Sequence, residues 1–140
     1  MCEPTGLAAV VLCGGLGTRL RSVVADRPKV QAEVLGRPFI SYLFDQIAVA
    51  GVRRVILASG YRGEQLKHEF GERYHFTKGG PAVLELLYSQ ETEPLGTGGA
   101  LRQAAQFAPK STLLVLNGDS FCEADLGAFL KTHQERKAAA

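Results

Sequence analysis

The stretch VVLCGGLGTRLRSVVADRPK, Val10–Lys29, begins as an apolar run and continues as a loop rich in glycine and basic side chains. The run Leu7–Leu12 predicts a buried strand, because it is short, partly β-branched and followed directly by glycines. A strand that ends in glycines offers backbone N–H groups to a ligand, since no Cβ keeps the ligand away. The sequence therefore predicts a phosphate-binding turn built on three glycines, Gly14, Gly15 and Gly17.

Two well-known glycine-rich loops do not fit this stretch. A Walker A loop needs a glycine at the position of Arg19, followed by Lys and Ser or Thr. The dinucleotide fingerprint fails at Leu20, where its third glycine belongs, so a nicotinamide-binding Rossmann domain is disfavoured. The remaining pattern supplies two cations, because Arg19 can fork onto phosphate oxygens and Lys29 can reach a second phosphoryl group. The alternative is a tight turn with two surface cations, and we favour phosphate binding because the loop follows the first buried strand directly.

Apolar runs and helical periodicity alternate along the rest of the chain. Three runs predict further buried strands, Arg54–Ala58, Val83–Tyr88 and Thr112–Leu116, and Val30–Leu35 predicts a short strand or hairpin arm. Helices are expected from Pro38 to Gly51, over about Glu64–Phe70, from an N-cap at Thr97 to Pro109, and from Leu126 onward. Strands that alternate with helices predict a Rossmann-like α/β/α fold with a mostly parallel sheet, whose ligands bind beyond the carboxyl ends of the strands.

Bulk properties narrow the class of protein. The chain has 140 residues, 46% of them hydrophobic and 21% charged, which predicts one domain with a packed core. A net charge of +2 does not favour a nucleic-acid surface, and the sequence shows neither a membrane-length apolar run nor a basic leader. The three cysteines have no metal-binding spacing, so free thiols in the cytoplasm are expected, with Cys13 a small buried residue rather than a nucleophile.

The motifs, taken together, resemble the sugar-nucleotide pyrophosphorylases, the nucleotidyltransferases that act on nucleoside triphosphates and sugar 1-phosphates. The family signature is a first strand, then G-G-x-G-T-R-L, then Pro-Lys, which here is Gly14–Leu20 and Pro28-Lys29. The resemblance continues through GRPFISYLFDQIAVAGV, ASGYRGEQLKHEFG, YSQETEPLGTGGAL and LLVLNGDSF, and so covers Leu7 to about Phe129. The segments LRSVVADRPK and EPLGTGGAL look most like the guanylyltransferases that act on heptose 1-phosphate, and next like those that act on mannose 1-phosphate.

The resemblance implies a reaction and a role for each matching residue. An oxygen of the sugar phosphate attacks the α-phosphorus of the nucleotide and pyrophosphate leaves, so no general base is required. Arg19 would hold the β- and γ-phosphates, Lys29 the α-phosphate or sugar phosphate, and Asp119 a Mg²⁺ ion between phosphates. The nucleotide would further contact Leu12, Gly14, Gly15, Gly17, Thr18, Gln90, Gly96, Thr97, Gly98, Asn117 and Gly118, with the loop around Gly96–Gly98 facing the base.

The sequence departs from the family pattern at two points. Val30-Gln31 replaces a small or apolar pair after Pro-Lys, and we expect Gln31 to face solvent. Family members also continue well beyond 140 residues, so we expect an N-terminal, nucleotide-binding part of a longer enzyme, able to bind a nucleotide at best if it stands alone. The alternatives are a uridylyl- or thymidylyltransferase acting on glucose 1-phosphate, or a non-catalytic nucleotide-binding module. Neither nucleic acid nor membrane is expected as a partner, whereas a homo-oligomer is compatible with the sequence.

Overall fold

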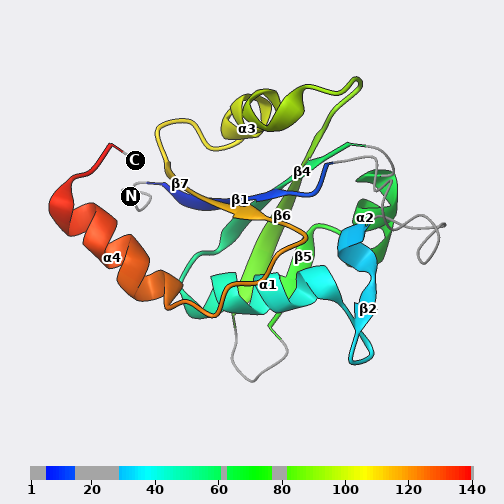
Figure 1. Cartoon of the computed structure of the whole chain (residues 1–140), viewed down its shortest axis with the longest axis horizontal. Coiled ribbons are helices and arrows are strands. Elements are labelled where there is room, and N and C mark those ends of the chain that lie inside the picture. Colours follow the sequence, from blue (N-terminus) through cyan, green and yellow to red (C-terminus); the bar gives the residue numbers. More distant parts are fainter. Residues whose placement is uncertain (1–5, 15–28, 61–62, 77–81, 140) are drawn as a thin grey trace.

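A computed structural model describes residues 6–14, 29–60, 63–76 and 82–139, with Lys29 described by its backbone alone. Within these residues the chain forms one five-stranded sheet with helices on both faces (Figure 1). No helix in these ranges is long and apolar enough to span a bilayer.

The sheet has the strand order β5-β6-β4-β1-β7. Four strands run parallel: β1 (Leu7–Leu12), β4 (Arg54–Ser59), β6 (Val83–Gln90) and β7 (Thr112–Asn117). The parallel sheet of the sequence prediction is therefore confirmed. The strand β5 (Arg73–His75) was not predicted, and it pairs antiparallel with β6 at one edge.

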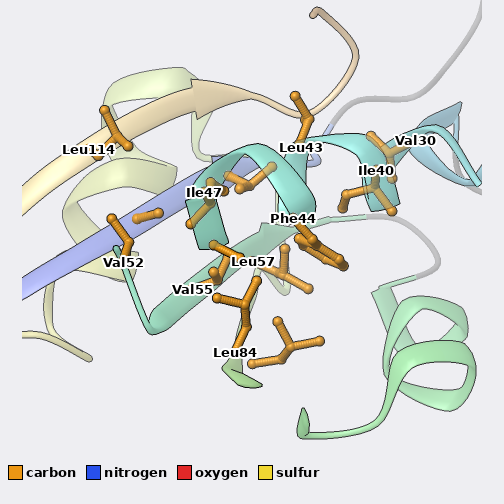
Figure 2. Packing of buried hydrophobic residues seen from close by; sticks show 14 of the residues in the cluster. Val30, Ile40, Leu43, Phe44, Ile47, Val52, Val55, Leu57, Leu84 and Leu114 are labelled. Atoms are coloured by element: carbon orange, nitrogen blue, oxygen red, sulfur yellow. The ribbon is translucent and has the colours of Figure 1, made fainter. Parts of the chain in front are cut away.

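Helices cover the two faces unequally. Three helices, α1 (Phe39–Val49), α2 (Gly63–Phe70) and α4 (Leu126–Arg136), contribute to the larger core cluster, and α3 (Gly96–Ala105) packs on the opposite face. In Figure 1, α3 lies above the sheet and α1 and α4 lie below it. Figure 2 shows Phe44 and Ile47 of α1 against Val55 and Leu57 of β4, in the centre of the larger core.

The helix α1 follows the sequence prediction closely. It begins directly after Pro38, and its four periodic apolar residues, Ile40, Leu43, Phe44 and Ile47, are all buried. Gly51 adopts a φ of +85°, the left-handed conformation that ends a helix and that glycine adopts without steric cost.

The start of α3 differs from the prediction. Thr97 was expected to cap the helix, but the helix already begins at Gly96, and Leu95 occupies the cap position without a side-chain hydrogen bond. The expected cap at Thr97 is therefore wrong. The N–H of Leu95, the cap residue itself, donates a hydrogen bond of 3.0 Å to Glu91 Oε2.

The segment after Lys29 is a short helix followed by a hairpin, rather than one strand over Val30–Leu35. A 3₁₀ helix, η1 (Lys29–Gln31), precedes the antiparallel pair β2 (Glu33–Val34) and β3 (Arg37–Pro38). The two turn residues, Leu35 and Gly36, both have positive φ, as a tight two-residue hairpin turn requires. The hairpin arm was thus predicted correctly and the 3₁₀ helix was not.

An ion pair within a hydrogen-bonded cluster joins the hairpin to the sheet. Arg37 Nη2 lies 2.8 Å from Asp45 Oδ2 and 3.2 Å from Tyr74 Oη, and the Tyr74 hydroxyl lies 3.1 Å from Asp45 Oδ1. The Asp45 side chain is only 8% exposed. This cluster connects β3, α1 and β5, so it fixes the hairpin that follows η1.

Candidate functional site

The carboxyl ends of the four parallel strands lie level with one another. Leu12 is in register with Ala58 and with Asn117, and Ser59 is in register with Gln90. Three backbone hydrogen bonds continue the ladder past the strand ends: Cys13 N to Ala58 O at 2.8 Å, Glu91 N to Ser59 O at 2.9 Å, and Gly118 N to Leu12 O at 2.9 Å. The loops that follow β1, β4, β6 and β7 therefore leave the sheet side by side, as ligand sites in parallel sheets require.

This edge brings together the described members of the predicted site. Leu12, Gly14, Gln90, Asn117, Gly118 and Asp119 all lie there, on or directly after three different strands. Their assignment to a ligand stays a prediction. Gly15, Gly17, Thr18 and Arg19 lie outside the described residues.

Gly118 explains how the backbone of Lys29 comes to this edge. A Cβ on Gly118 would lie 2.9 Å from Leu12 O, 3.0 Å from Val30 Cγ1 and 3.2 Å from Cys13 Sγ. Only glycine leaves room for this contact, and Val30 itself is 2% exposed. The chain position of Lys29, one residue before Val30, is therefore fixed beside the residue that precedes Asp119.

Asp119 is an exposed carboxylate at the end of β7, and Ser120 Oγ lies 3.3 Å from its Oδ1. No group of three His, Cys, Asp or Glu residues suited to a metal occurs in the described part of the chain. An exposed carboxylate with few protein neighbours of its kind nevertheless fits Mg²⁺, which keeps several waters and uses one or two carboxylates plus substrate phosphates.

Cys13 follows β1 but does not have the properties of a nucleophile. Burial raises the pKa of the Cys13 thiol well above its usual range, and the negative charge of Asp119 raises it further. A thiol attacks as its thiolate, which this environment disfavours. The structure therefore supports the expectation that Cys13 is a small packing residue.

The first turn of α3 is open to a ligand. Gly96, Thr97 and Gly98 are exposed, and a Cβ on Gly98 would meet no atom within 4 Å. Gln103 Nε2 donates a 2.8 Å hydrogen bond to Gln90 O, which ties the end of β6 to α3. The loop predicted to face a base is thus held to the sheet edge while its backbone remains accessible.

Gln31 is not where the sequence placed it. It was expected to face solvent, but it is 3% exposed, so that expectation is wrong. Its Nε2 donates to the Glu69 carboxylate and, at 3.4 Å, to Gln65 O, both on α2. Its Oε1 has no hydrogen-bond partner among the described residues. The burial follows from η1, because a turn that packs Val30 into the core brings the next residue inward against α2.

Sequence reasoning missed Glu91. This residue follows β6, and its Oε1 lies 3.1 Å from the point where a Cβ on Gly14 would sit. The carboxylate therefore lies beside Gly14 in the loop after β1 and accepts a hydrogen bond from the loop before α3. A Glu directly after a buried strand, level with the glycine loop, is a signal that could have indicated it.

A large cavity lies away from the predicted site residues. It has a volume of about 1280 Å³ and opens at the amino ends of the strands, where its lining includes Arg53, Lys67, Glu72 and Arg73. The predicted site residues lie at the opposite edge of the sheet. Their assignment depends on the strand ends and not on this cavity.

Known proteins resemble this chain over almost its whole length. The family model described as nucleotidyl transferase matches residues 8–140. The chain is 39% identical over 132 residues to D-glycero-alpha-D-manno-heptose 1-phosphate guanylyltransferase of Aneurinibacillus thermoaerophilus, with 94% of the chain and 54% of the relative covered. It is 38% identical over 130 residues to mannose-1-phosphate guanylyltransferase of Mycobacterium tuberculosis, with 93% of the chain and 34% of the relative covered.

A solved structure shows the same fold at similar identity. The crystal structure of HddC from Yersinia pseudotuberculosis complexed with GMP-PN matches with a TM-score of 0.74 and 36% identity, over 90% of this chain and 53% of that one. The chain spans about half the length, or less, of the relatives it matches.

Proposed function

We propose that this chain, which belongs to the nucleotidyl transferase family, forms the nucleotide-binding part of an enzyme that joins GTP to a sugar 1-phosphate. The products would be a GDP-sugar and pyrophosphate. The observation that carries the proposal is the arrangement of Gly14, Gly118 and Asp119 at one sheet edge, with the backbone of Lys29 packed beside them. Heptose or mannose 1-phosphate is the favoured second substrate, because relatives at 38–39% identity carry those names.

The chemistry suits a site with cations and no base. A phosphate oxygen of the sugar 1-phosphate forms a bond to the α-phosphorus of GTP, while the bond from that phosphorus to the bridging oxygen breaks and pyrophosphate leaves. The attacking oxygen is already anionic at neutral pH, so no proton has to be removed. The barrier comes from bringing anions together and from charge on the leaving group, and positioning with electrostatic stabilisation lowers it.

Each proposed role follows from place and charge. Lys29 would neutralise the α-phosphate or the incoming sugar phosphate, and Arg19 the β- and γ-phosphates. Asp119 would hold Mg²⁺, which supplies positive charge to the phosphate oxygens when bound. The backbone of Gly14, and that of the turn after Leu95, would contact the nucleoside. We propose that the protein acts in the cytoplasm, the compartment that its sequence predicts.

Product analysis tests the function directly. The full-length protein that contains these 140 residues is incubated with Mg²⁺, heptose or mannose 1-phosphate, and GTP, UTP or dTTP, while pyrophosphate release is followed and GTP binding is measured by isothermal titration. Release with GTP supports the proposal, and release with UTP or dTTP alone would replace it by a uridylyl- or thymidylyltransferase. Nucleotide binding without release would leave a non-catalytic nucleotide-binding module.

Two substitutions test the roles of the charged residues. In the full-length protein, Lys29→Ala should reduce turnover by about 100-fold or more, as removal of one electrostatic stabiliser does elsewhere, without a change in melting temperature. Lys131→Ala, an exposed lysine of α4, is the matched control. Asp119→Asn should raise the Mg²⁺ concentration needed for half-maximal turnover, and an unaltered Mg²⁺ titration would remove Asp119 from the metal site.

A further inference from the structure

Gln31 is a polar side chain buried between the 3₁₀ helix η1 and α2. It is 3% exposed, and its Nε2 donates to the Glu69 carboxylate and, at 3.4 Å, to the Gln65 carbonyl oxygen. Its Oε1 is buried and has no hydrogen-bond partner among the described residues. An apolar side chain of the same shape would avoid the cost of that buried oxygen, so stability alone does not account for a glutamine at this position.

The helix α2, which receives these hydrogen bonds, is itself fixed to the sheet. Leu66 in the middle of the helix is 1% exposed and belongs to the larger core cluster. Gly63, where the helix begins, packs closely against the last residue of β4, because a Cβ on Gly63 would lie 2.4 Å from Ser59 Oγ. A side chain that is hydrogen-bonded to α2 is therefore held at a fixed place relative to the strand ends.

Two neighbouring residues hold η1 from two sides. Val30 is 2% exposed, and its Cγ1 lies 3.0 Å from the position that a Cβ on Gly118 would take. Successive residues of a 3₁₀ helix point about 120° apart, so Gln31 contacts a different neighbour, α2. Apolar packing is not directional and does not by itself fix the rotation of η1, whereas a hydrogen bond to a carboxylate is directional and strong. Together the two residues fix the backbone of η1, including its first residue, Lys29.

We propose that Gln31 is a positioning residue, which binds the Glu69 carboxylate and thereby fixes the turn that carries Lys29. The inference rests on the proposed function, in which Lys29 neutralises a phosphate group. A displacement of about 1 Å can cost about 100-fold in rate, because stabilisation of the transition state depends on where each charge is held. Other proposed residues also hold the nucleotide in its ground state. Loss of the Gln31 contact should therefore lower kcat and leave the KM for GTP almost unchanged.

Two variants of the full-length protein remove the contact from its two sides. Gln31→Met and Glu69→Ala should each lower kcat by about 10-fold and change the KM for GTP by less than about 2-fold. They should change stability in opposite directions, because Gln31→Met removes a buried polar group and Glu69→Ala leaves the buried amide without its charged partner. A loss of turnover shared by both variants therefore cannot result from stability. Glu69→Gln, whose amide oxygen still accepts the hydrogen bond, should keep at least about half of the wild-type kcat.

A double-mutant cycle with Lys29→Ala tests whether Gln31 acts through Lys29. In that background Gln31→Met should cause no further loss of kcat, because the group that it positions is absent. Gln134→Met, the same change at an exposed residue of α4, is the control and should leave kcat unchanged.

Two results would overturn the inference. The first is an equal fractional loss of kcat from Gln31→Met in the wild-type and Lys29→Ala backgrounds. The second is an unchanged kcat in Glu69→Ala, which decides the question even if Gln31→Met does not fold. In both cases turnover of GTP by the wild-type protein would leave the proposed function intact, whereas a wild-type protein that releases no pyrophosphate would overturn the two together.

Discussion

Gln31→Met should raise the free energy of unfolding by about 1 kcal/mol, although it removes a hydrogen bond. Gln31 is 3% exposed, its Nε2 donates to the Glu69 carboxylate, and its Oε1 has no partner in the described part of the chain. Methionine has nearly the same length and volume as glutamine, so the replacement tests polarity rather than packing.

Three contributions determine the sign. The lost bond to a charged partner costs about 2 kcal/mol, near the lower end for such bonds because Glu69 is exposed and regains water. Removal of a buried oxygen that has no partner in the described part of the chain increases the free energy of unfolding by about 2 kcal/mol. Burial of the apolar methionine sulfur and methyl group beside Val30 increases the free energy of unfolding by about 1 kcal/mol more. The balance is a gain of about 1 kcal/mol, equivalent to a rise of about 3 °C in melting temperature for a chain of this size.

Urea unfolding followed by circular dichroism measures the change, with the m-value checked for constancy. A double-mutant cycle with Glu69→Ala isolates the interaction. Glu69→Ala should cost about 1–2 kcal/mol in the wild-type chain and almost nothing in Gln31→Met, because the partner is then absent. A loss of more than 1 kcal/mol in Gln31→Met, or an equal cost of Glu69→Ala in both backgrounds, would refute the reasoning.

Three further predictions concern two glycines, a buried tyrosine and an ion pair. Gly118→Ala should destabilise the fold by about 1–3 kcal/mol, because its Cβ would meet backbone and core atoms near 3 Å. Gly98→Ala, at an open helical position, should be neutral or stabilising by up to about 1 kcal/mol. Urea unfolding measures both changes. Burial raises the pKa of Tyr88 to about 12, so between about pH 10 and 12 the native state keeps a phenolic proton that the unfolded state has lost, and the free energy of unfolding should fall as the pH rises through this range. Tyr88→Phe should remove this part of the pH dependence. A pH profile that Tyr88→Phe leaves unchanged would contradict the assignment. Asp45→Ala leaves the Arg37 guanidinium without its carboxylate partner at a mostly buried position, and thermal unfolding should show a loss of about 3 kcal/mol; a loss below about 1 kcal/mol would show that water replaces the carboxylate without cost.

Local patterns in the sequence were sufficient for the strands and for the edge at which the site lies. Apolar runs such as Leu7–Leu12 are buried on both faces of a parallel sheet, so composition alone identifies them. The parallel order then places the strand-end loops together without any side-chain detail. The strand β5 lacks such a signal, because its three residues are partly exposed and become a strand only by pairing with β6.

Contacts between distant residues could not be predicted in the same way. The environment of Gln31 depends on Glu69, 38 positions away, and the environment of Glu91 depends on Gly14, in the loop after another strand. The cap predicted at Thr97 failed for a related reason, since Thr97 is a good capping residue in isolation but the helix already begins at Gly96, after a turn in which Glu91 accepts the Leu95 N–H. Each of these depends on which loops the sheet brings together, a property of topology rather than of any short segment.

The strand order also gives the proposed site a direction. Along the carboxyl edge the order β6-β4-β1-β7 places the Glu91 carboxylate at one end, the glycine loop in the middle and Asp119 with the Lys29 backbone at the other. Three inter-strand spacings separate the ends, about 14 Å in total, which is comparable to an extended nucleoside triphosphate. The Glu91 carboxylate at the β6 end repels phosphates, whereas the lysine and the metal proposed for the β7 end attract them. These charges favour the orientation in which the base of the nucleotide lies toward β6 and its α-phosphate lies toward β7, where the second anion has to enter.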